Sequence, residues 1–304
     1  APTMLLSAAG ALLAAGFVAF AALRIVAAVM PVRREPAAGR LAGHELPVYT
    51  VIVALYREAL SVEPLLRALD ALDYPREKLD IKIVVEADDP ATRAVLARAL
   101  AQRGTPPHLQ VIVAPREGPR TKPKALACAL PFAHGSFVTV FDAEDCPEPG
   151  QLRAALAAFR GHGPEVVCVQ ARLCIDNRRA SWLARMFAVE YAGQFDAFLP
   201  GLAALGLPLP LGGSSNHFRV EELRRVGGWD PYNVTEDADL GMRLARFGYR
   251  AVTVASTTFE EAPVHFTPWL RQRTRWMKGW LQTWIVHMRR PRQLWRDSGA
   301  AGWL

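Results

Sequence analysis

The N-terminal segment constrains this chain most strongly, because it is apolar over a length that few soluble elements reach. Residues Leu5 to Leu23 contain no charged side chain, and with Arg24 included the apolar run continues to Met30. About 20 apolar residues are enough for a helix to cross a bilayer. We therefore predict a transmembrane helix within residues 1–32. The alternatives are a signal peptide, whose positively charged start is missing here, and an unusually long buried core helix.

Basic residues follow this segment and indicate its orientation. Arg33, Arg34 and Arg40 lie in a linker that we place at residues 33–47. Because cytoplasmic flanks of membrane helices are rich in Lys and Arg, we expect everything after this helix on the cytoplasmic side of a bacterial-type inner (plasma) membrane. The chain lacks an initiator Met and ends abruptly, so we expect it to be part of a longer membrane protein.

The composition is that of a folded, basic protein. The 304 residues, 51% of them hydrophobic, suffice for one sizeable α/β domain with accessory segments. The net charge of +7 is compatible with nucleic acid, anionic lipid or a phosphate-bearing ligand. The cysteines lie among apolar residues without C-x-x-C spacing, so we expect buried, reduced thiols rather than a disulfide or zinc site. They are Cys128, Cys146, Cys168 and Cys174.

Strand-length apolar runs alternate with helical patterns in residues 48–262, which is typical of an α/β domain. Strands are predicted at Tyr49–Leu55, Ile81–Glu86, Leu109–Val113, Phe137–Phe141 and Val166–Ala171. Helices are predicted at Ser61–Leu72, Pro90–Gln102 and Pro149–Phe159. Asp89 is the expected N-cap of the second helix. The chain contains neither G-x-G-x-x-G nor a Walker loop, which disfavours an ordinary dinucleotide or ATP cradle.

Acidic residues follow two of these strands. Asp88 and Asp89 come after one strand, and Asp142, Glu144 and Asp145 come after another. Ligands of such sheets gather at the carboxyl ends of strands, so both sets are expected in one crevice. Closely spaced carboxylates suit Mg²⁺ or Mn²⁺, which prefer oxygen ligands. The alternative is that these acids cap turns and the following helix.

A further acidic pair begins a helical pattern that Gly248 ends. Glu236 and Asp237 follow Thr235 at its start. Acids at a helix N-terminus are stabilised by the helix dipole, which is one explanation of the pair. The other is that Asp237, held on a rigid helix start, is a general base that deprotonates a sugar hydroxyl.

The region 263–297 carries the third constellation, an aromatic helix. At 100° per residue Trp269, Trp276, Trp280 and Trp284 share one face, and Arg271, Arg275 and Lys278 lie broadly opposite. With the basic cluster from Arg289 to Arg296, this predicts an amphipathic helix in a membrane interface. The alternative is a helix packed on a soluble core. We place the start of a truncated membrane segment at residues 298–304.

Seven short motifs follow one another along the chain. They are Tyr56-Arg57-Glu58, Asp88-Asp89, Lys122-Pro-Lys124, Phe141-Asp142-Ala-Glu144, Gly212-Gly213-Ser214-Ser215, Thr235-Glu236-Asp237 and Gln272-Arg-Thr-Arg275-Trp276. In this order they resemble the family 2 glycosyltransferases, particularly the membrane-bound processive synthases of cellulose, chitin and hyaluronan. The resemblance spans roughly Thr50 to Trp284 and implies a GT-A type fold, a Rossmann-like mixed sheet flanked by helices.

The resemblance also implies an activity and its residues. A metal-dependent inverting transferase would move a sugar from a nucleotide-diphosphate donor, expected to be a UDP-sugar, to a saccharide acceptor in polysaccharide synthesis. Asp237 would be the base, and the other catalytic residues would be Glu236, Gln272, Arg275 and Trp276. Donor binding would fall to Tyr56, Glu58, Asp88, Asp89, Lys122, Lys124, Gly213 and Ser214. Mg²⁺ or Mn²⁺ would be held by Asp142 and Glu144.

Two departures from the family pattern affect the choice of the second metal ligand and of the nucleoside ligand. Asp142-Ala143-Glu144 stands where Asp-x-Asp is usual, and although Asp145 follows, Glu144 is the expected second metal ligand. Pro90 replaces the common Gly after the first acidic pair, so the sequence does not separate Asp88 from Asp89 as the nucleoside ligand.

Two other functions compete with catalysis. A catalytically silent membrane receptor would bind a nucleotide or nucleotide-sugar without turnover, but the intact set of Asp237, Gln272 and Arg275 argues against it. A nucleic-acid binder is suggested by net charge alone. We expect no nucleic acid partner, because the basic residues cluster on the predicted interfacial helix and linker. The expected partners are the donor, the saccharide acceptor and a lipid bilayer.

Overall fold

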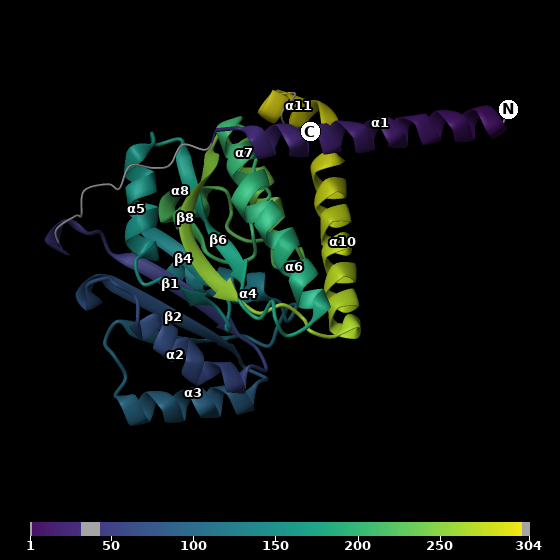
Figure 1. Ribbon diagram of the computed structural model, residues 1–304. Helices are drawn as coiled ribbons and strands as arrows, with labels where there is room; N and C mark the ends of the chain where they lie inside the picture. Colours follow the sequence, from purple (N-terminus) through teal and green to yellow (C-terminus); the bar gives the residue numbers. More distant parts are fainter. Residues whose placement is uncertain (1, 32–42, 300–304) are drawn as a thin grey trace.

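One mixed sheet runs through the described part of the chain, residues 2–31 and 43–299 of a computed structural model (Figure 1). Its strand order is β3-β2-β1-β4-β7-β6-β8-β5. The strands are β1 Tyr49–Leu55, β2 Leu79–Glu86, β3 Leu109–Ala114, β4 Phe137–Phe141, β5 Cys146–Pro147, β6 Val166–Ile175, β7 Asn216–Arg219 and β8 Arg250–Glu260. Residues 33–42 of the predicted linker, including its three arginines, and residues 300–304 lie outside the described residues.

The predicted α/β architecture is confirmed, and the limits of β1 and β4 are those expected from the sequence. Strand β1 pairs in parallel with β2 and with β4, and β2 pairs in parallel with β3. These strands read as continuous β-branched runs because helices cover both faces of a parallel sheet. Strand β7 runs antiparallel between β4 and β6, which makes the sheet mixed.

Strands β5, β7 and β8 are absent from the sequence-based prediction. In β7 the polar residues Asn216 and His217 are buried, which hides the strand from a hydrophobicity pattern. The Nδ1 atom of His217 lies 2.7 Å from the hydroxyl of Tyr49. Burial lowers the pKa of His217 to about 3, so the imidazole is neutral in the sheet. This hydrogen bond compensates part of the cost of burying a polar ring.

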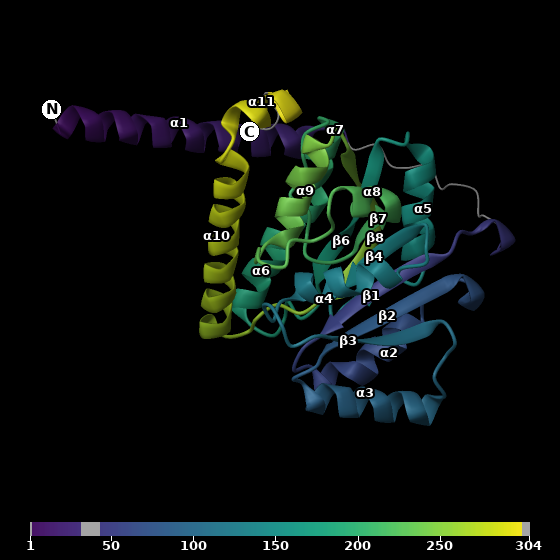
Figure 2. The same ribbon diagram turned by 180° about the vertical axis from the view of Figure 1, so that it is seen from behind.

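Helices cover the two faces of the sheet (Figures 1 and 2). They are α1 Pro2–Val29, α2 Val62–Asp70, α3 Pro90–Arg103, α4 Lys122–Ala129, α5 Gln151–Gly161, α6 Trp182–Ala192, α7 Leu199–Ala204, α8 Val220–Arg225, α9 Glu236–Arg246, α10 Phe266–Met288 and α11 Pro291–Ser298. Short 3-10 turns lie at η1 Gly43–Glu45, η2 Ala59–Ser61, η3 Arg76–Lys78 and η4 Leu130–Phe132, and a π-helix at η5 Gly193–Phe198. Apolar residues of α2, α3 and α5 pack on one face of the sheet, and those of α4, α7, α8 and α9 pack on the other.

Helix α1 projects from the domain and contacts it only near its C-terminal end (Figures 1 and 2). Residues Gly10–Val29 have a mean hydropathy of 2.3 and are 6% buried, so the helix is long and apolar enough to cross a membrane. At the contact, Ala27 meets Gly201 of α7, where an added Cβ would lie 2.1 Å from the Ala27 carbonyl oxygen. The glycine therefore permits the close approach of the two helices.

The cysteines are free, as the sequence predicts, but their burial differs from the expectation. Only Cys168 is buried, whereas Cys146 is exposed on the short edge strand β5. Edge position rather than local hydrophobicity decides the exposure of Cys146.

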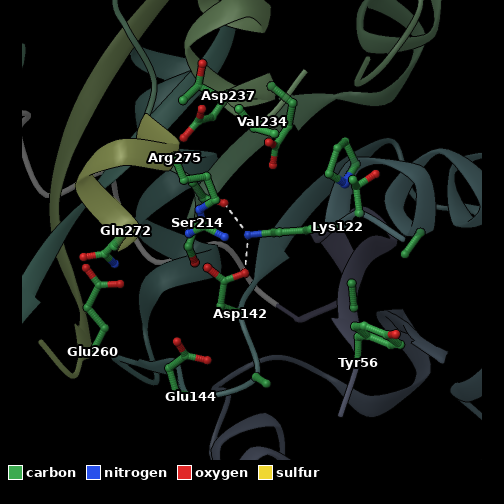
Figure 3. A pocket seen from close by; sticks show the side chains of 18 of the residues that line it. Tyr56, Lys122, Asp142, Glu144, Ser214, Val234, Asp237, Glu260, Gln272 and Arg275 are labelled. Carbon is green, nitrogen blue, oxygen red and sulfur yellow. Dashed lines mark hydrogen bonds and ion pairs between the residues drawn. The ribbon is translucent and has the colours of Figure 1, made fainter. Parts of the chain in front are cut away.

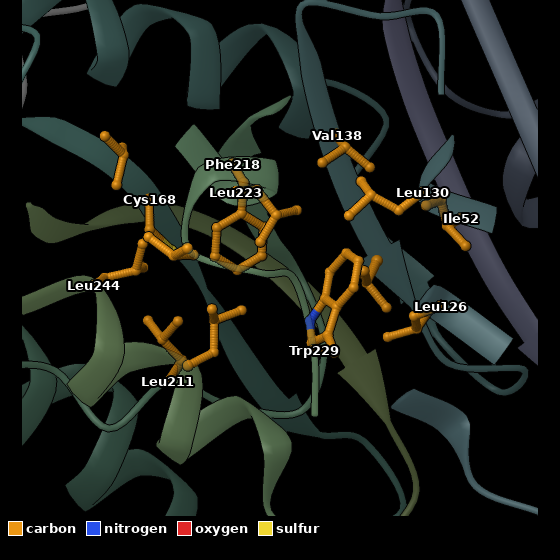
Figure 4. Packing of buried hydrophobic residues seen from close by; sticks show 14 of the residues in the cluster. Ile52, Leu126, Leu130, Val138, Cys168, Leu211, Phe218, Leu223, Trp229 and Leu244 are labelled. Atoms are coloured by element: carbon orange, nitrogen blue, oxygen red, sulfur yellow. The ribbon is translucent and has the colours of Figure 1, made fainter. Parts of the chain in front are cut away.

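The largest core cluster joins the sheet to α4, α8 and α9. Trp229 lies among Leu126, Leu130 and Phe218 in this cluster (Figure 4). Its ring meets that of Phe218 edge to face, with centroids 6.0 Å apart. Because Trp229 directly follows Gly227 and Gly228, its burial fixes the loop that leads to α9.

The burial of Trp229 and the exposure of Trp182 predict different losses of stability when each is replaced by alanine. Trp229 is 3% exposed and Trp182 is 68% exposed. Trp229→Ala should lower the free energy of unfolding by about 3–5 kcal/mol, because it leaves a large cavity. Trp182→Ala should change it by less than about 0.5 kcal/mol. Urea unfolding followed by circular dichroism measures both, and equal losses would contradict this description of the core.

Candidate active site

The sheet creates a crevice where the chain changes direction. Strand β1 lies between β2 and β4, so the segments that follow β1 and β4 diverge at their carboxyl ends. Such switch points are the usual ligand sites of open α/β sheets. Tyr56 follows β1 and Asp142 follows β4. A cleft of about 610 Å³ opens at this edge.

Most of the predicted site residues line this one cleft (Figure 3). They are Tyr56, Glu58, Lys122, Asp142, Glu144, Gly213, Ser214, Glu236, Asp237, Gln272, Arg275 and Trp276. They come from strand ends, from the starts of α4 and α9, and from α10, which are far apart in the sequence. Asp88, Asp89 and Lys124 are not among the lining residues.

Asp89 acts on the cleft wall indirectly. Its carboxylate accepts hydrogen bonds from Thr92 N as the N-cap of α3, as predicted, and from Arg57 N at 2.5 Å. Arg57 has a φ of +60°, an uncommon conformation for a residue other than glycine. The Asp89 hydrogen bond therefore holds the turn that directs Tyr56 and Glu58 into the cleft.

The other two predicted donor ligands have partners of their own. Asp88 pairs with Arg120 at 3.0 Å, which lowers the pKa of the Asp88 carboxyl, and Arg120 itself lines the cleft. Lys124 is buried and donates to Glu86 at 2.8 Å. Its ammonium thus supports the wall from behind, because Glu86 is a lining residue.

Lys122 is the central cation of the cleft. Its ammonium forms an ion pair with Asp142 and donates to the Gly213 carbonyl at 2.6 Å (Figure 3). Burial lowers the pKa of Lys122, but the carboxylates of Asp142 and Glu236 outweigh that effect and raise it above its ordinary value. The lysine therefore stays charged at neutral pH.

The two acids after Asp142 have different surroundings. Glu144 lines the cleft, and burial with the nearby Asp142 charge raises the pKa of its carboxyl. Asp145 is buried, where its Oδ2 accepts hydrogen bonds from the backbone N–H of Asp142 at 2.7 Å and from the Ser214 hydroxyl. Asp145 thus braces the loop, and Glu144 is the acid available to a ligand.

Burial and mutual repulsion also affect Glu236 and Asp237 at the N-terminus of α9. Burial raises the pKa of Asp237 to about 6 and that of Glu236 to about 8. The Asp237 carboxylate accepts a hydrogen bond from Ala238 N at 2.8 Å, which keeps its pKa the lower of the two. Because burial raises the pKa of both neighbouring carboxyls, the pair shares about one proton near neutral pH.

Helix α10 brings Gln272, Arg275 and Trp276 to the cleft. Arg275 lines the cleft together with Trp276, although it lies broadly opposite the tryptophan stripe on the helix. The tryptophans divide between surroundings, since Trp276 is partly buried whereas Trp280 and Trp284 are exposed. The interfacial role of the exposed tryptophans stays a prediction.

Two further acidic residues of the cleft, Glu260 and Glu261, are absent from the sequence-based prediction. Glu260 ends β8, lines the cleft and has a buried Oε1 without a hydrogen-bond partner among the described residues. Burial and the Asp142 charge raise its pKa to about 7. Tyr191 of α6 also lines the cleft. Acids that follow a β-branched run, here Glu260 and Glu261, are the sequence signal for this part of the cleft.

The carboxylates fit a hard cation by their chemistry. Within residues 2–31 and 43–299, no group of three His, Cys, Asp or Glu side chains is arranged to hold a metal ion. Asp142 and Glu144 nevertheless offer oxygen ligands in one cleft, and burial with repulsion by Asp142 raises the pKa of Glu144, which a bound cation would counteract. Mg²⁺ and Mn²⁺ both accept such ligands.

The curated relatives of this chain are named as glycosyltransferases. Among curated relatives, the probable glucomannan 4-beta-mannosyltransferase 15 of Arabidopsis thaliana is 25% identical over 244 residues, covering 78% of this chain and 45% of that protein. The probable glycosyltransferase YdaM of Bacillus subtilis (strain 168) is 24% identical over 244 residues, covering 77% of this chain and 56% of that protein. The chain thus spans about half the length of these relatives.

Two solved structures share the fold. The mannosyltransferase PcManGT from Pyrobaculum calidifontis, in complex with GDP-Man and Mn²⁺, has a TM-score of 0.67 and 23% identity, covering 96% of this chain and 83% of that one. TarS 1-349 of S. aureus in complex with UDP-GlcNAc has a TM-score of 0.50 and 18% identity, covering 72% of this chain and 59% of that one. These likenesses confirm the GT-A type fold.

Family models cover most of the domain. Residues 50–216 match the model described as glycosyl transferase family 2, and residues 137–304 match glycosyl transferase family group 2. The first match contains the ends of β1 and β4, and the second contains α9 and α10 with their cleft residues. The chain belongs to glycosyl transferase family 2.

Proposed function

We propose that this chain transfers a sugar, with inversion, from a nucleotide-diphosphate-sugar to a saccharide acceptor, and that the reaction depends on Mg²⁺ or Mn²⁺. One observation carries the proposal. Asp237 and the metal-ligand candidates Asp142 and Glu144 line separate parts of one cleft, with the Lys122 ammonium between them (Figure 3). An inverting displacement needs this separation of base and leaving group.

The donor's diphosphate fits the basic side chains of the cleft. The guanidinium of Arg275 has no carboxylate partner among the described residues and reaches the same space as Lys122 (Figure 3). Both can neutralise negative charge that develops on a departing diphosphate. A divalent cation held by Asp142 and Glu144 would supply further charge stabilisation there. Tyr56 and Glu58, at the end of β1, would contact the nucleoside.

The acceptor side fits Asp237 and the aromatic residues. The Trp276 ring lies near that of Phe187, with centroids 6.0 Å apart, and both line the cleft. Apolar ring faces are suitable platforms for a sugar. Asp237 would take the proton of the attacking hydroxyl, because its carboxyl lines the cleft from the first turn of α9. Gln272 would hydrogen-bond the substrate.

Two further features of the proposal come from the whole chain. Relatives named glucomannan mannosyltransferases support a role in polysaccharide synthesis. The apolar α1 supports attachment to a bacterial-type inner membrane, with the catalytic domain in the cytoplasm. The neighbours' GDP-Man and UDP-GlcNAc support a nucleotide-sugar donor, for which we retain a UDP-sugar as the expected choice.

The base assignment predicts different outcomes for the paired acids. Asp237→Asn should lower the transfer rate by about 10²-fold or more, because an amide cannot accept the proton, and should preserve donor affinity. Glu236→Gln mimics the protonated side chain and should retain the rate within about threefold. Release of nucleoside diphosphate measures transfer, and calorimetry measures its binding. Wild-type transfer by Asp237→Asn would rule out the base role.

The raised pKa of Asp237 predicts the pH dependence of transfer. Because the base must be deprotonated, kcat should rise with pH through about 6, well above the ordinary range of an aspartate. The measurement is kcat from pH 4.5 to 8.5 at saturating donor and acceptor. A kcat that stays constant down to pH 4.5 would contradict the burial of this carboxylate.

The metal assignment predicts a loss at Asp142 that chelation reproduces. A chelator should abolish turnover of the unmodified chain, and Mg²⁺ or Mn²⁺ should restore it. Asp142→Asn should weaken both donor binding and transfer by at least about tenfold, because the cation would contact the diphosphate in both states. Asp176→Asn alters an exposed carboxylate after β6 and is the matched control. Full activity in chelator would remove the metal from this function.

A further inference from the structure

The second half of helix α10 meets the domain through small and polar residues. The buried positions are Gly279, Thr283 and His287, which recur every four residues along one side. The exposed large apolar residues of the helix are Phe266, Leu270, Met277, Trp280, Leu281, Trp284 and Ile285. In the first half Trp269 and Trp276 pack against the apolar cluster around Phe187, whereas the second half contacts α9 through hydrogen bonds and close backbone approach.

The buried positions of α10 contact the start of α9 and the loop before it. Gly279 faces Thr235, where an added Cβ would lie 2.4 Å from the threonine methyl. One turn later, the Thr283 hydroxyl accepts a hydrogen bond from Asn233 Nδ2 at 2.9 Å. The Asn233 Oδ1 in turn accepts the backbone N–H of Thr235 at 3.1 Å. Thr283 thus holds Thr235, which is the N-cap residue of α9.

Gly279, Thr283 and His287 form a polar seam between α10 and α9. The third of these residues contacts the body of α9. His287 Nε2 lies 3.1 Å from Asp239 Oδ1, and its Nδ1 lies 3.3 Å from Arg246 Nη1. Because Arg246 can only donate, Nδ1 accepts, and the Nε2–H group donates a hydrogen bond to the Asp239 carboxylate. Burial favours a raised pKa for Asp239, but hydrogen bonds from His287 and Arg243 and the Arg243 charge lower it below the ordinary value. Arg246 also pairs with Asp297 of α11 at 2.9 Å.

The seam connects the two groups of cleft residues that the proposed reaction needs. Glu236 and Asp237 directly follow Thr235, whereas Gln272, Arg275 and Trp276 lie on the turns of α10 that precede Gly279. Both groups are on rigid helices, so their separation depends on how α10 is placed along α9. Figure 2 shows the two helices side by side.

We infer that Thr283 and His287 are positioning residues, which fix the carboxylates of α9 relative to the Gln272–Trp276 stretch of α10. The inference rests on the proposed function, since it concerns the geometry of that reaction. Directional hydrogen bonds suit this role, because an apolar contact would tolerate sliding of one helix along the other whereas the seam specifies one register. Misplacement of catalytic groups by about 1 Å costs about 10²-fold in rate.

The test compares two threonines of α10. Thr283→Val keeps the side-chain shape and removes the hydroxyl that Asn233 contacts, and should lower kcat by about tenfold while the donor KM changes less than about twofold. Thr267→Val is the matched control, because its exposed side chain lies in the first turn of α10, outside the Gln272–Trp276 stretch. Thr283→Ser keeps the hydroxyl and should restore kcat to within about threefold of the unmodified chain.

Further measurements separate positioning from folding. All kcat values are divided by the fraction of sites that bind nucleoside diphosphate in calorimetry, so loss of folded protein does not count as loss of rate. In an Asp237→Asn background, adding Thr283→Val should cost less than about twofold, because a group that acts through Asp237 has little left to align. His287→Asn should behave like Thr283→Val in both backgrounds.

Each outcome is decisive. Equal kcat for Thr283→Val and Thr267→Val would overturn the positioning role, as would an undiminished tenfold effect in the Asp237→Asn background. If the unmodified chain releases no nucleoside diphosphate from any nucleotide-sugar with metal and acceptor, the proposed function fails first and the inference fails with it.

Discussion

Strand β1 is held between two parallel neighbours, and the whole site depends on that pairing. Its alternate residues face opposite cores, so that Ile52 packs with α4 while Val51 and Val53 pack with α2 and α3. A slip of β1 by one residue would turn each buried side chain toward the other core, to which it is not fitted. Burial of both faces therefore fixes the register. The fixed register places Tyr56 beside Asp142 at the diverging ends of β1 and β4. The residues that α4, α9 and α10 contribute to the cleft also lie at this edge of the sheet.

The electrostatics of the cleft follow from the same convergence. Acidic residues from β4, β8 and α9 crowd around Lys122, and burial with repulsion raises the pKa of Glu144, Glu236 and Glu260. A bare diphosphate would be repelled here, because the lysine is already paired with Asp142. A diphosphate that arrives with a divalent cation brings the charge that these carboxylates need. In the proposed reaction, metal and donor would therefore bind as a mutually dependent pair.

The sequence predicts the local parts of the structure well, for physical reasons. Strand β1 is buried on both faces and Asp89 caps the next helix through its own neighbour Thr92, so each leaves a short-range pattern. Strand β7 has no such pattern, because His217 is compensated by a distant hydroxyl. Only tertiary contacts make that strand favourable. Local patterns therefore predict β1 and the cap of α3, whereas the end of β6 at Ile175, four residues beyond the predicted Ala171, and the buried polar strand β7 depend on tertiary pairing.

The candidate site divides in the same way. Motif order brings Asp142, Lys122 and Asp237 together correctly in one cleft, because each lies at the end of a regular element. Lys124 has a residue type suited to a phosphate ligand, but its side chain points to the buried Glu86, and no sequence pattern reveals that direction. Glu260 is the reverse case, since its part in the cleft depends on β8 lying beside β6.

Helix α10 shows which part of a helix contact the tryptophan pattern does not reveal. The pattern predicts an aromatic face in a membrane interface but says nothing of the opposite contact, which the glycine, threonine and histidine at 279, 283 and 287 make with α9. Apolar residues such as Met277 and Leu281 remain on the outside. Helix α1 presents a second apolar surface, and its C-terminal end meets α7 at Gly201. If both surfaces enter the same membrane, as the proposed attachment implies, α10 contacts lipid on one side and the N-terminus of α9 on the other. The polar seam then links the depth of α10 in the membrane to the position of Asp237.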